Sequence, residues 1–146
     1  MARLVVPSLL SAAVVLAAWS AATAEPAAGF RVIVNPANPI DKLDKRVVAE
    51  VFLKKRTRWD GDRAIQPVDL GQKSGVRGAF SHDVLGRDVV SVRRYWAQLV
   101  FSGRGVPPPE LATDGDVVKF VAAHSGAIGY VAAGVALAGV KVVEVD

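Results

Sequence analysis

The sequence contains no cysteine and only two histidines. The absence of cysteine excludes disulfide bonds, thiolate metal sites and cysteine nucleophiles. The histidines, His82 and His124, lie on predicted helices, where a helix-end or solvated position is more common than a ligand role. A catalytic pair of His82 with Asp83 or with Asp69 stays open as an alternative. We therefore predict neither a metal site nor a cofactor, and a fold that rests on its hydrophobic core alone.

Motifs of nucleotide-binding and hydrolytic enzymes are also absent. No glycine is followed at the right spacing by the Gly-Lys-Ser/Thr of a Walker loop. Residues 103–105, Gly-Arg-Gly, lack the third glycine of a dinucleotide loop. The serine of residues 71–75 stands one place too late for a nucleophile elbow. These absences predict that the chain is not an enzyme, and an unrecognised hydrolase is the least favoured of three functions that we consider.

Neither sign of charge dominates the chain, which has 18 basic and 14 acidic residues. Without Arg3, which belongs to a predicted leader, 17 basic residues remain, and the net charge is 17 − 14 = +3. The basic residues are interspersed except over residues 54–58, Lys-Lys-Arg-Thr-Arg, and a nucleic-acid surface needs a larger patch. We predict no nucleic-acid partner. The basic run is interpreted as cations at a helix C-terminus rather than as a site for an anionic partner.

The longest hydrophobic stretch is N-terminal. Arg3 supplies a positive start, residues 4–19 are mostly apolar, and an Ala-Thr-Ala follows as a cleavage site. This order predicts a secretory signal peptide over residues 1–24 and a mature domain over residues 25–146. An uncleaved membrane anchor is the alternative, although a proline and two serines interrupt the apolar run. We expect a periplasmic or secreted protein, and the lack of cysteine excludes a lipoprotein anchor.

Apolar periodicity and turn residues predict an alternation of strands and helices. The expected strands cover residues 30–35, 64–68, 126–131 and 140–145. The expected helices cover residues 45–54, 76–84, 89–102 and 114–124, with a further short helix over 132–138. The candidate N-caps are Asp44, Ser74, and Thr113 or Asp114. Residues 103–113, which hold three consecutive prolines, are expected to be irregular. The order predicts an α/β layered domain.

Residues 67–80 are typical of a strand end, a tight polar loop and the first turns of a helix. Ser74 can cap this helix because its hydroxyl can accept a hydrogen bond from an amide one turn later. Gly75 lets a ligand approach the backbone, and neighbouring basic residues add positive charge. A helix N-terminus has free N–H groups and the positive end of the dipole, so it attracts anions. The sequence therefore predicts an oxyanion site at Ser74, Gly75, Val76 and Arg77.

The same stretch resembles the phosphate ABC transporter substrate-binding protein family (PstS-like proteins), whose second lobe places a Ser-Gly-Thr at a helix start against the oxyanion. Here the triplet is Ser74-Gly75-Val76. Residues 126–131, Gly-Ala-Ile-Gly-Tyr-Val, closely match a strand of that family, and residues 95–105 match a segment of its short members. Two departures are visible: Val76 lacks the threonine hydroxyl, and Leu70 stands where the family usually places an arginine.

The resemblance implies a single lobe of a type 2 periplasmic-binding-protein fold, with a mixed sheet flanked by helices and Trp59 packed on the lobe. It covers nearly all of residues 25–146, but only the second lobe of the two-lobed members, so the chain would hold half of a ligand cleft. The implied ligand is phosphate or another small oxyanion. The implied partners are an ABC permease or another envelope protein, and a homodimer could supply the missing wall.

Two functions follow from this resemblance. The first is an exported phosphate-binding or oxyanion-binding protein that resembles the substrate-binding component of a phosphate ABC transporter. The Ser-Gly at a helix start favours it. The alternative is a single-lobe envelope interaction module that has lost solute capture, and the missing arginine and threonine favour this second function.

Overall fold

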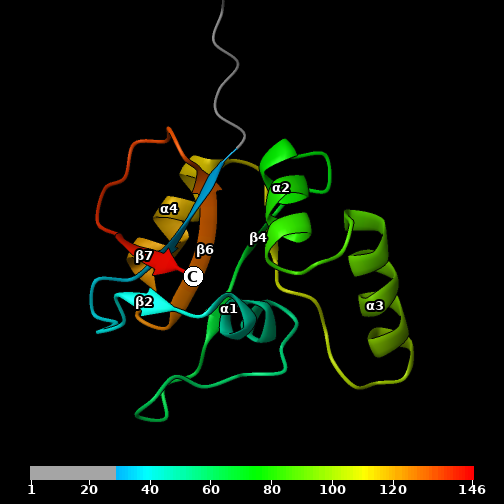
Figure 1. Cartoon of the computed structure of the whole chain (residues 1–146). Coiled ribbons are helices and arrows are strands. Elements are labelled where there is room, and N and C mark those ends of the chain that lie inside the picture. The colour runs from blue at the N-terminus through cyan, green and yellow to red at the C-terminus, as the bar shows by residue number, and fades with distance from the viewer. Residues whose placement is uncertain (1–28) are drawn as a thin grey trace, which may run out of the picture.

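Residues 29–146 are described by a computed structural model, and the predicted leader over residues 1–24 lies outside this range. Within the described range, strands and four helices alternate along the chain (Figure 1). None of these helices is long and apolar enough to cross a membrane. The α/β class predicted from the sequence is confirmed.

A five-stranded mixed sheet forms the centre of the described range, in the strand order β2-β7-β1-β6-β3. Its strands are β1 (Phe30–Val34), β2 (Lys42–Leu43), β3 (Gln66–Pro67), β6 (Ala127–Ala132) and β7 (Lys141–Val145). β1 is antiparallel to its neighbours β6 and β7, whereas β2 and β3 pair in parallel at the two edges. The strands predicted at 30–35, 126–131 and 140–145 are confirmed to within one residue at each end.

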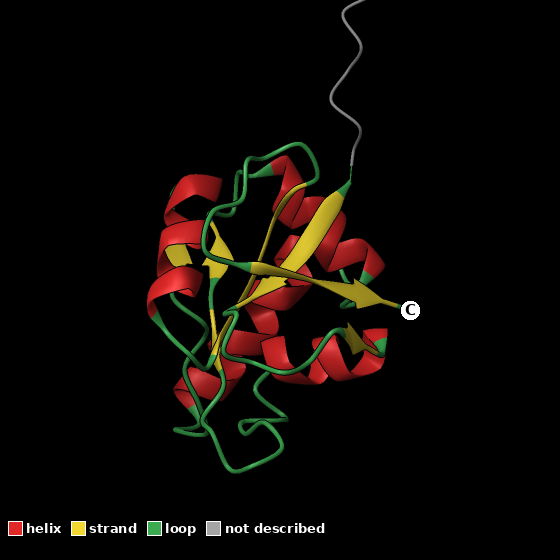
Figure 2. Cartoon of the chain, turned by 90° about the vertical axis from the view of Figure 1, so that its left-hand side faces the viewer, coloured by secondary structure: helices red, strands yellow, loops and turns green. Residues whose placement is uncertain are grey.

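The helices are α1 (Lys45–Phe52), α2 (Gly75–Asp83), α3 (Val89–Phe101) and α4 (Asp114–Ala123). α4 covers one face of the sheet, α1 and α2 pack on the other, and α3 lies outside α2 (Figures 1 and 2). Asp44, Ser74 and Thr113 each accept a hydrogen bond from an amide in the first turn, as predicted. Asp88 caps α3 in the same way. Short polar side chains therefore set where each helix begins.

The two faces of β6 are packed in different ways. A Cβ atom on Gly129 would lie 2.6 Å from Val117 Cγ1, so the glycine lets α4 lie directly on the strand. On the other face, the Tyr130 ring stacks on Phe80 with 3.9 Å between centroids. Phe52 of α1 meets Phe80 edge-on at 4.7 Å. Such aromatic pairs contribute about 0.5–1.5 kcal/mol each beyond the area that they bury, and here they fix α1 and α2 on the sheet.

Trp59 belongs to the loop that joins α1 to β3. Its side chain is buried, and its indole N–H donates to the Gly126 carbonyl at 3.0 Å. Gly126 is needed there because a Cβ atom would lie 2.1 Å from the Ala64 carbonyl oxygen. The prediction that Trp59 packs on the lobe is confirmed.

The basic run over residues 54–58 follows the end of α1, which stops at Phe52, short of the predicted residue 54. Lys54 adopts a left-handed backbone conformation (φ 53°) and its amide donates to the Val51 carbonyl at 3.0 Å. The amides of Lys55 and Arg56 both donate to the Glu50 carbonyl. The cations thus follow the helix C-terminus, where they interact favourably with the negative end of the helix dipole.

The prediction that residues 103–113 are irregular is wrong at one point. Glu110–Leu111 form a short strand, β5, which pairs in parallel with β4 (Asp69–Leu70) as a second, two-stranded sheet. Of the strand predicted over residues 64–68, only β3 is formed, and β4 begins just after the predicted end. A two-residue strand has no periodicity of its own, and only its pairing partner stabilises it.

The short helix predicted over residues 132–138 is also wrong, because Ala132 ends β6 and residues 133–138 are turn, coil and bend. β6 and β7 are both antiparallel to β1, so they run in the same direction. The connection must therefore return along the length of the sheet. An extended chain advances about 3.3 Å per residue, whereas a helix advances only about 1.5 Å. The segment is held to the sheet by Arg31, whose Nη2 donates to the Val135 carbonyl at 2.5 Å.

Candidate functional site

The predicted oxyanion site lies where β4 passes into α2. The Ser74 amide donates to the Gly71 carbonyl at 2.9 Å, which closes the turn. The Ser74 hydroxyl accepts from the Arg77 amide at 3.3 Å, so its own O–H is left to donate elsewhere. The amides of Gly75 and Val76 form no hydrogen bond with the other residues in the described range. The N-terminus of α2 therefore presents two backbone donors and one hydroxyl donor.

Solvent reaches this helix end. Gly75 is exposed, and Ser74 and Val76 are half-buried. Lys73 is also exposed, and Arg93 of α3 donates to the side chain of the neighbouring Gln72 at 3.4 Å. The outer side of the site thus carries two positive charges in addition to the helix dipole.

Arg77 lies beneath this surface, with its side chain 5% exposed. Its Nη1 donates to the Leu70 carbonyl at 2.7 Å and to Glu110 Oε1 at 2.6 Å. Its Nη2 lies 3.2 Å from Asp69 Oδ2. The buried Nε has no partner among residues 29–146. The guanidinium therefore fastens the first turn of α2 to both strands of the small sheet, and its terminal donors are used inside the protein.

Asp69 is the buried acceptor of this network. It accepts from the Tyr130 hydroxyl and from the Leu70 amide, the latter at 2.9 Å. Burial raises the pKa of the Asp69 carboxyl, and the opposing effects of Arg77, Tyr130 and the Leu70 amide do not cancel it. Burial, followed by the charge of Asp69, raises the pKa of Tyr130 well above its usual value. Tyr130 therefore stays protonated and remains a donor to Asp69.

The pairing of β4 with β5 places Asp69 directly opposite Glu110. Like charges at opposed positions of a ladder repel each other. Arg77 contacts both carboxyl groups, so it holds the small sheet together as well as the helix. Two acids against one arginine leave the underside of the site negative when both are ionised, which weakens the attraction of an anion above it.

Sequence reasoning placed Ser74, Gly75, Val76 and Arg77 together, and the structure brings all four into the first turn of α2 or its cap. It missed Asp69, Glu110 and Tyr130 as members of the site. One signal was available, because Arg77 shares the buried stripe of the helix with Phe80, Ser81 and Val84. A charged residue on a buried stripe requires a partner of opposite charge.

The two histidines take no part in this site. His82 lies 2.8 Å from its neighbour Asp83 and is largely exposed, whereas Asp69 is engaged by Tyr130 and Arg77. His124 ends α4, stacks on Phe120 and contacts the Phe120 carbonyl at 2.8 Å. Over residues 29–146, no group of three or more metal-ligating side chains is close enough to hold an ion.

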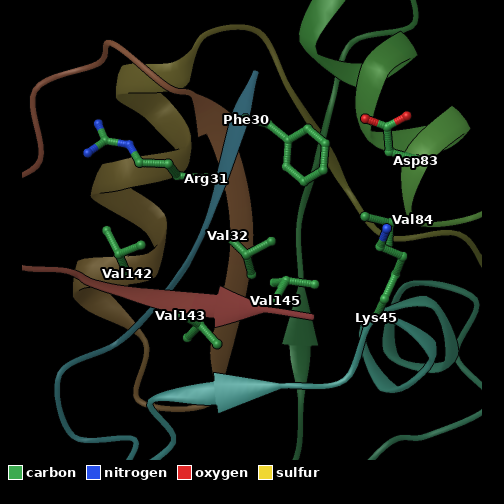
Figure 3. Close-up of a pocket in the computed structure, with 9 residues that line it drawn as sticks. All are labelled: Phe30, Arg31, Val32, Lys45, Asp83, Val84, Val142, Val143 and Val145. Carbon is green, nitrogen blue, oxygen red and sulfur yellow. The ribbon is translucent and has the colours of Figure 1, made fainter. Parts of the chain in front are cut away.

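A separate pocket opens between β1, β7 and the C-terminal end of α2 (Figure 3). Beside it, the pairing of β1 with β7 ends at Val32 and Val143, and residues 144–145 of β7 pair only with β2, on the other edge of the strand. Lys45 and Asp83 contribute its charged rim, while Arg31 points to the opposite side of β1 (Figure 3). None of the four predicted site residues lines this pocket.

No family model matches the sequence, and no curated protein matches it. Solved structures do match. A phosphate ABC transporter substrate-binding protein from Clostridium perfringens, with bound phosphate, superposes with a TM-score of 0.63 at 22% identity, over 81% of this chain and 45% of that one. An ABC-type phosphate transport receptor from Vibrio cholerae gives 0.58 at 18% identity, over 80% and 46%. PstS from Borrelia burgdorferi gives 0.55 at 14% identity, over 80% and 47%.

At these identities the likeness establishes the fold alone. The chain spans less than half the length of the proteins that it matches. The predicted fold class, one part of a type 2 periplasmic-binding-protein fold, is thereby confirmed. The first two of these neighbours are, by their names, a substrate-binding protein and a transport receptor.

Proposed function

We propose that the chain is an exported binding protein for a small oxyanion, with phosphate as the first candidate. The observation that carries the proposal is the exposed end of α2, where the amides of Gly75 and Val76 and the hydroxyl of Ser74 are free to donate. Tetrahedral oxyanions are bound well by free amides at a helix N-terminus. The phosphate-binding proteins that share the fold support phosphate over other anions.

Arg77 supports the site by position rather than by charge, because its guanidinium is paired with Asp69 and Glu110 and makes no contact at the surface. Its ties to Asp69, Glu110 and the Leu70 carbonyl keep the first turn of α2 in place. Donors that are already held in position lose little entropy when the anion binds. Arg77 thus preorganises the site that Gly75 and Val76 present.

The affinity is expected to be low. Val76 offers no hydroxyl, and Leu70, which is 2% exposed, offers no charge where an arginine would stand. An anion on an open lobe also keeps part of its hydration. We expect a dissociation constant of about 1 mM, equivalent to about 4 kcal/mol. A second lobe, a second copy of the chain, an ABC permease or another envelope protein would tighten binding by covering the site.

Calorimetric titration with phosphate and with sulfate tests the proposal. Ser74→Ala is expected to weaken phosphate binding by about 1 kcal/mol, because one hydrogen bond is lost. Thr113→Ala is the matched control, because Thr113 caps α4 in the same manner but is followed by Asp114 and Asp116 in the first turn. Absence of heat at tens of millimolar phosphate, or equal effects of the two variants, would contradict the proposal.

The alternative function, a single-lobe interaction module that has lost solute capture, is favoured by one observation. The loop retains the helix end but has Leu70 and Val76 at the two positions where the family resemblance expects polar ligands. A module of this kind would bind an envelope partner through another face. A chain that binds neither phosphate nor sulfate would bring this alternative forward.

A further inference from the structure

The outward face of α3 exposes apolar side chains. Five large hydrophobic residues are exposed in the described range, and four of them lie in α3 or in the loop after it: Val90, Val100, Phe101 and Val106. Phe101 is 95% exposed, although the opposite face of the same helix buries Val92 and Trp96. Single exposed apolar residues are common, but here four of five belong to one helix and the loop that follows it, which indicates an interaction surface. We call these four residues, with Arg94 and Arg104, the α3 face.

The α3 face carries charge of one sign. Residues 89–109 contain Arg93, Arg94 and Arg104 and no acidic residue. None of these arginines forms an ion pair within residues 29–146. Arg93 and Arg104 donate only to neutral oxygens of Gln72 and Ser102. Arg94 and Arg104 thus stand beside exposed apolar groups and form no ion pair in this part of the chain, and Asp88 is close enough for the charge of Arg94 to contribute to lowering its pKa.

Part of the α3 face follows one side of the helix. Val90, Arg94, Ala97 and Phe101 follow each other at intervals of four, three and four residues, and all are exposed. Such positions share one side of a helix, and they extend over about 16 Å. α3 lies at the outer edge of the molecule, away from the five-stranded sheet (Figure 1). A flat surface could therefore meet this side of the helix without touching the oxyanion site.

We propose that the α3 face docks on the surface of an anionic lipid bilayer. Phe101, Val100 and Val106 would enter the boundary between headgroups and acyl chains, and the arginines would meet lipid phosphates. The long aliphatic part of an arginine can lie along the apolar region while its head stays at the charged surface. The inference goes beyond anion binding by α2 and does not depend on it.

A bilayer fits this face better than a protein does. A 13-residue helix is about 20 Å long and about 10 Å wide. Its outer side therefore offers much less than the roughly 800 Å² per partner of a stable protein interface. A second copy of the chain is disfavoured as well, because two α3 faces would bring unpaired arginines together. A lipid surface needs only a few apolar groups with cations beside them.

Co-sedimentation with lipid vesicles tests the proposal. The protein is the chain from residue 25 onward, which keeps every described element but lacks the apolar leader. Binding is expected to vesicles of equal parts phosphatidylcholine and phosphatidylglycerol, and not to pure phosphatidylcholine. Raising the salt from about 0.05 M to about 0.5 M should weaken it, because screening shortens the range of the charge interactions.

Matched variants locate the contact. Phe101→Ser should weaken binding about tenfold or more, because one aromatic side chain no longer leaves water. Val142→Ser is the control, because Val142 is the fifth exposed large hydrophobic residue and lies on β7. Arg94→Gln with Arg104→Gln should weaken binding more than Lys55→Gln with Arg56→Gln, which removes two exposed cations elsewhere.

Three results would overturn the proposal. The first is no binding to the anionic vesicles at low salt, which would leave a protein partner as the occupant of the α3 face. The second is an equal loss of binding in Phe101→Ser and Val142→Ser. The third is a concentration-dependent dimer, seen by sedimentation, that Phe101→Ser dissociates, since a second copy would then cover the face.

Discussion

α2 and α3 are consecutive helices with opposite placements of charged and apolar residues. α2 buries the guanidinium of Arg77 between Asp69 and Glu110. α3 leaves its arginines unpaired within the described range and exposes Phe101. Both helices begin in the same way, at a capping side chain that accepts from an amide three residues later. The difference therefore lies in what each helix packs against, not in how it starts.

The two helices of this small lobe present their surfaces in two different ways. A buried ion network is weak evidence of stability, because desolvation of the charges opposes their attraction. In α2, the ion network of Arg77 keeps the free amides of Gly75 and Val76 in a fixed position. An exposed aromatic side chain contributes no hydrophobic free energy in the isolated chain, and it becomes stabilising only when a partner removes it from water. α2 thus offers a preformed site, and α3 offers a surface that needs a partner.

The largest expected effect comes from the buried arginine. Arg77→Met should lower the free energy of unfolding by about 3–5 kcal/mol, because Asp69 loses its partner in a buried position. Arg94→Met on α3 is the control and should change it by less than about 0.5 kcal/mol, since Arg94 is exposed. Urea unfolding measures both. Equal effects of the two substitutions would erase the contrast between the helices.

Two tyrosine hydroxyls sharpen the same contrast. Tyr130 donates to the Asp69 carboxyl beside α2, and Tyr95 of α3 donates to the Leu53 carbonyl at 2.9 Å. Hydrogen bonds to charged groups contribute about 1.5–3 kcal/mol, and neutral ones about 0.5–1.5 kcal/mol. Tyr130→Phe should therefore destabilise the protein more than Tyr95→Phe in thermal unfolding. The reverse order would mean that the Asp69 network adds little.

The pH dependence of stability should have opposite signs at the two helices. Burial raises the pKa of Asp69 in the folded protein. The resulting contribution to the free energy of unfolding is fully present below the unfolded pKa of about 3.9 and is lost as the pH rises through the folded pKa. Hydrogen bonds from Ser91 lower the pKa of Asp88, so its contribution is present above about 3.9 and is lost as the pH falls through the folded pKa.

Denaturation curves from pH 3 to pH 8 test these signs. Asp69→Asn should remove the loss of stability toward neutral pH, and Asp88→Asn should remove a loss toward acid pH. The two variants serve as controls for each other. If both substitutions change the pH profile in the same direction, burial does not raise the pKa of Asp69 as described.

The smallest effect concerns the caps, where the two helices are expected to agree. Ser74→Ala and Asp88→Ala should each lower the free energy of unfolding by about 1 kcal/mol, because each removes one capping hydrogen bond. Thermal unfolding of both variants measures this. A much larger loss for Ser74→Ala would show that its hydroxyl supports the Arg77 network and not only the helix start.

Local chemistry made much of the fold predictable. Asp44, Ser74 and Thr113 were identified as caps because capping depends on side chains within a few residues of each other. β5 was missed because Glu110 and Leu111 form a strand only when β4 lies beside them. The helix expected over residues 132–138 was wrong because β6 and β7 run in the same direction, so their connection must return along the sheet, and local patterns do not show that direction.

The candidate site was predictable in part for the same reason. Ser74 to Arg77 are neighbours in sequence, so their joint position on α2 followed from helical periodicity. Glu110 lies 33 residues from Arg77, and Tyr130 lies 61 residues from Asp69. Contacts at such separation depend on the pairing of strands, which local patterns do not encode. The buried role of Arg77 therefore emerged only with the fold.

The most direct test of the central claim follows the backbone amides during a titration with phosphate. Nuclear magnetic resonance of the 15N-labelled chain, from residue 25 onward, should show the largest shift changes at Gly75 and Val76, with a midpoint of about 1 mM. Shift changes confined to the basic run over residues 54–58, or spread evenly over the exposed lysines and arginines, would contradict an oxyanion site at the N-terminus of α2.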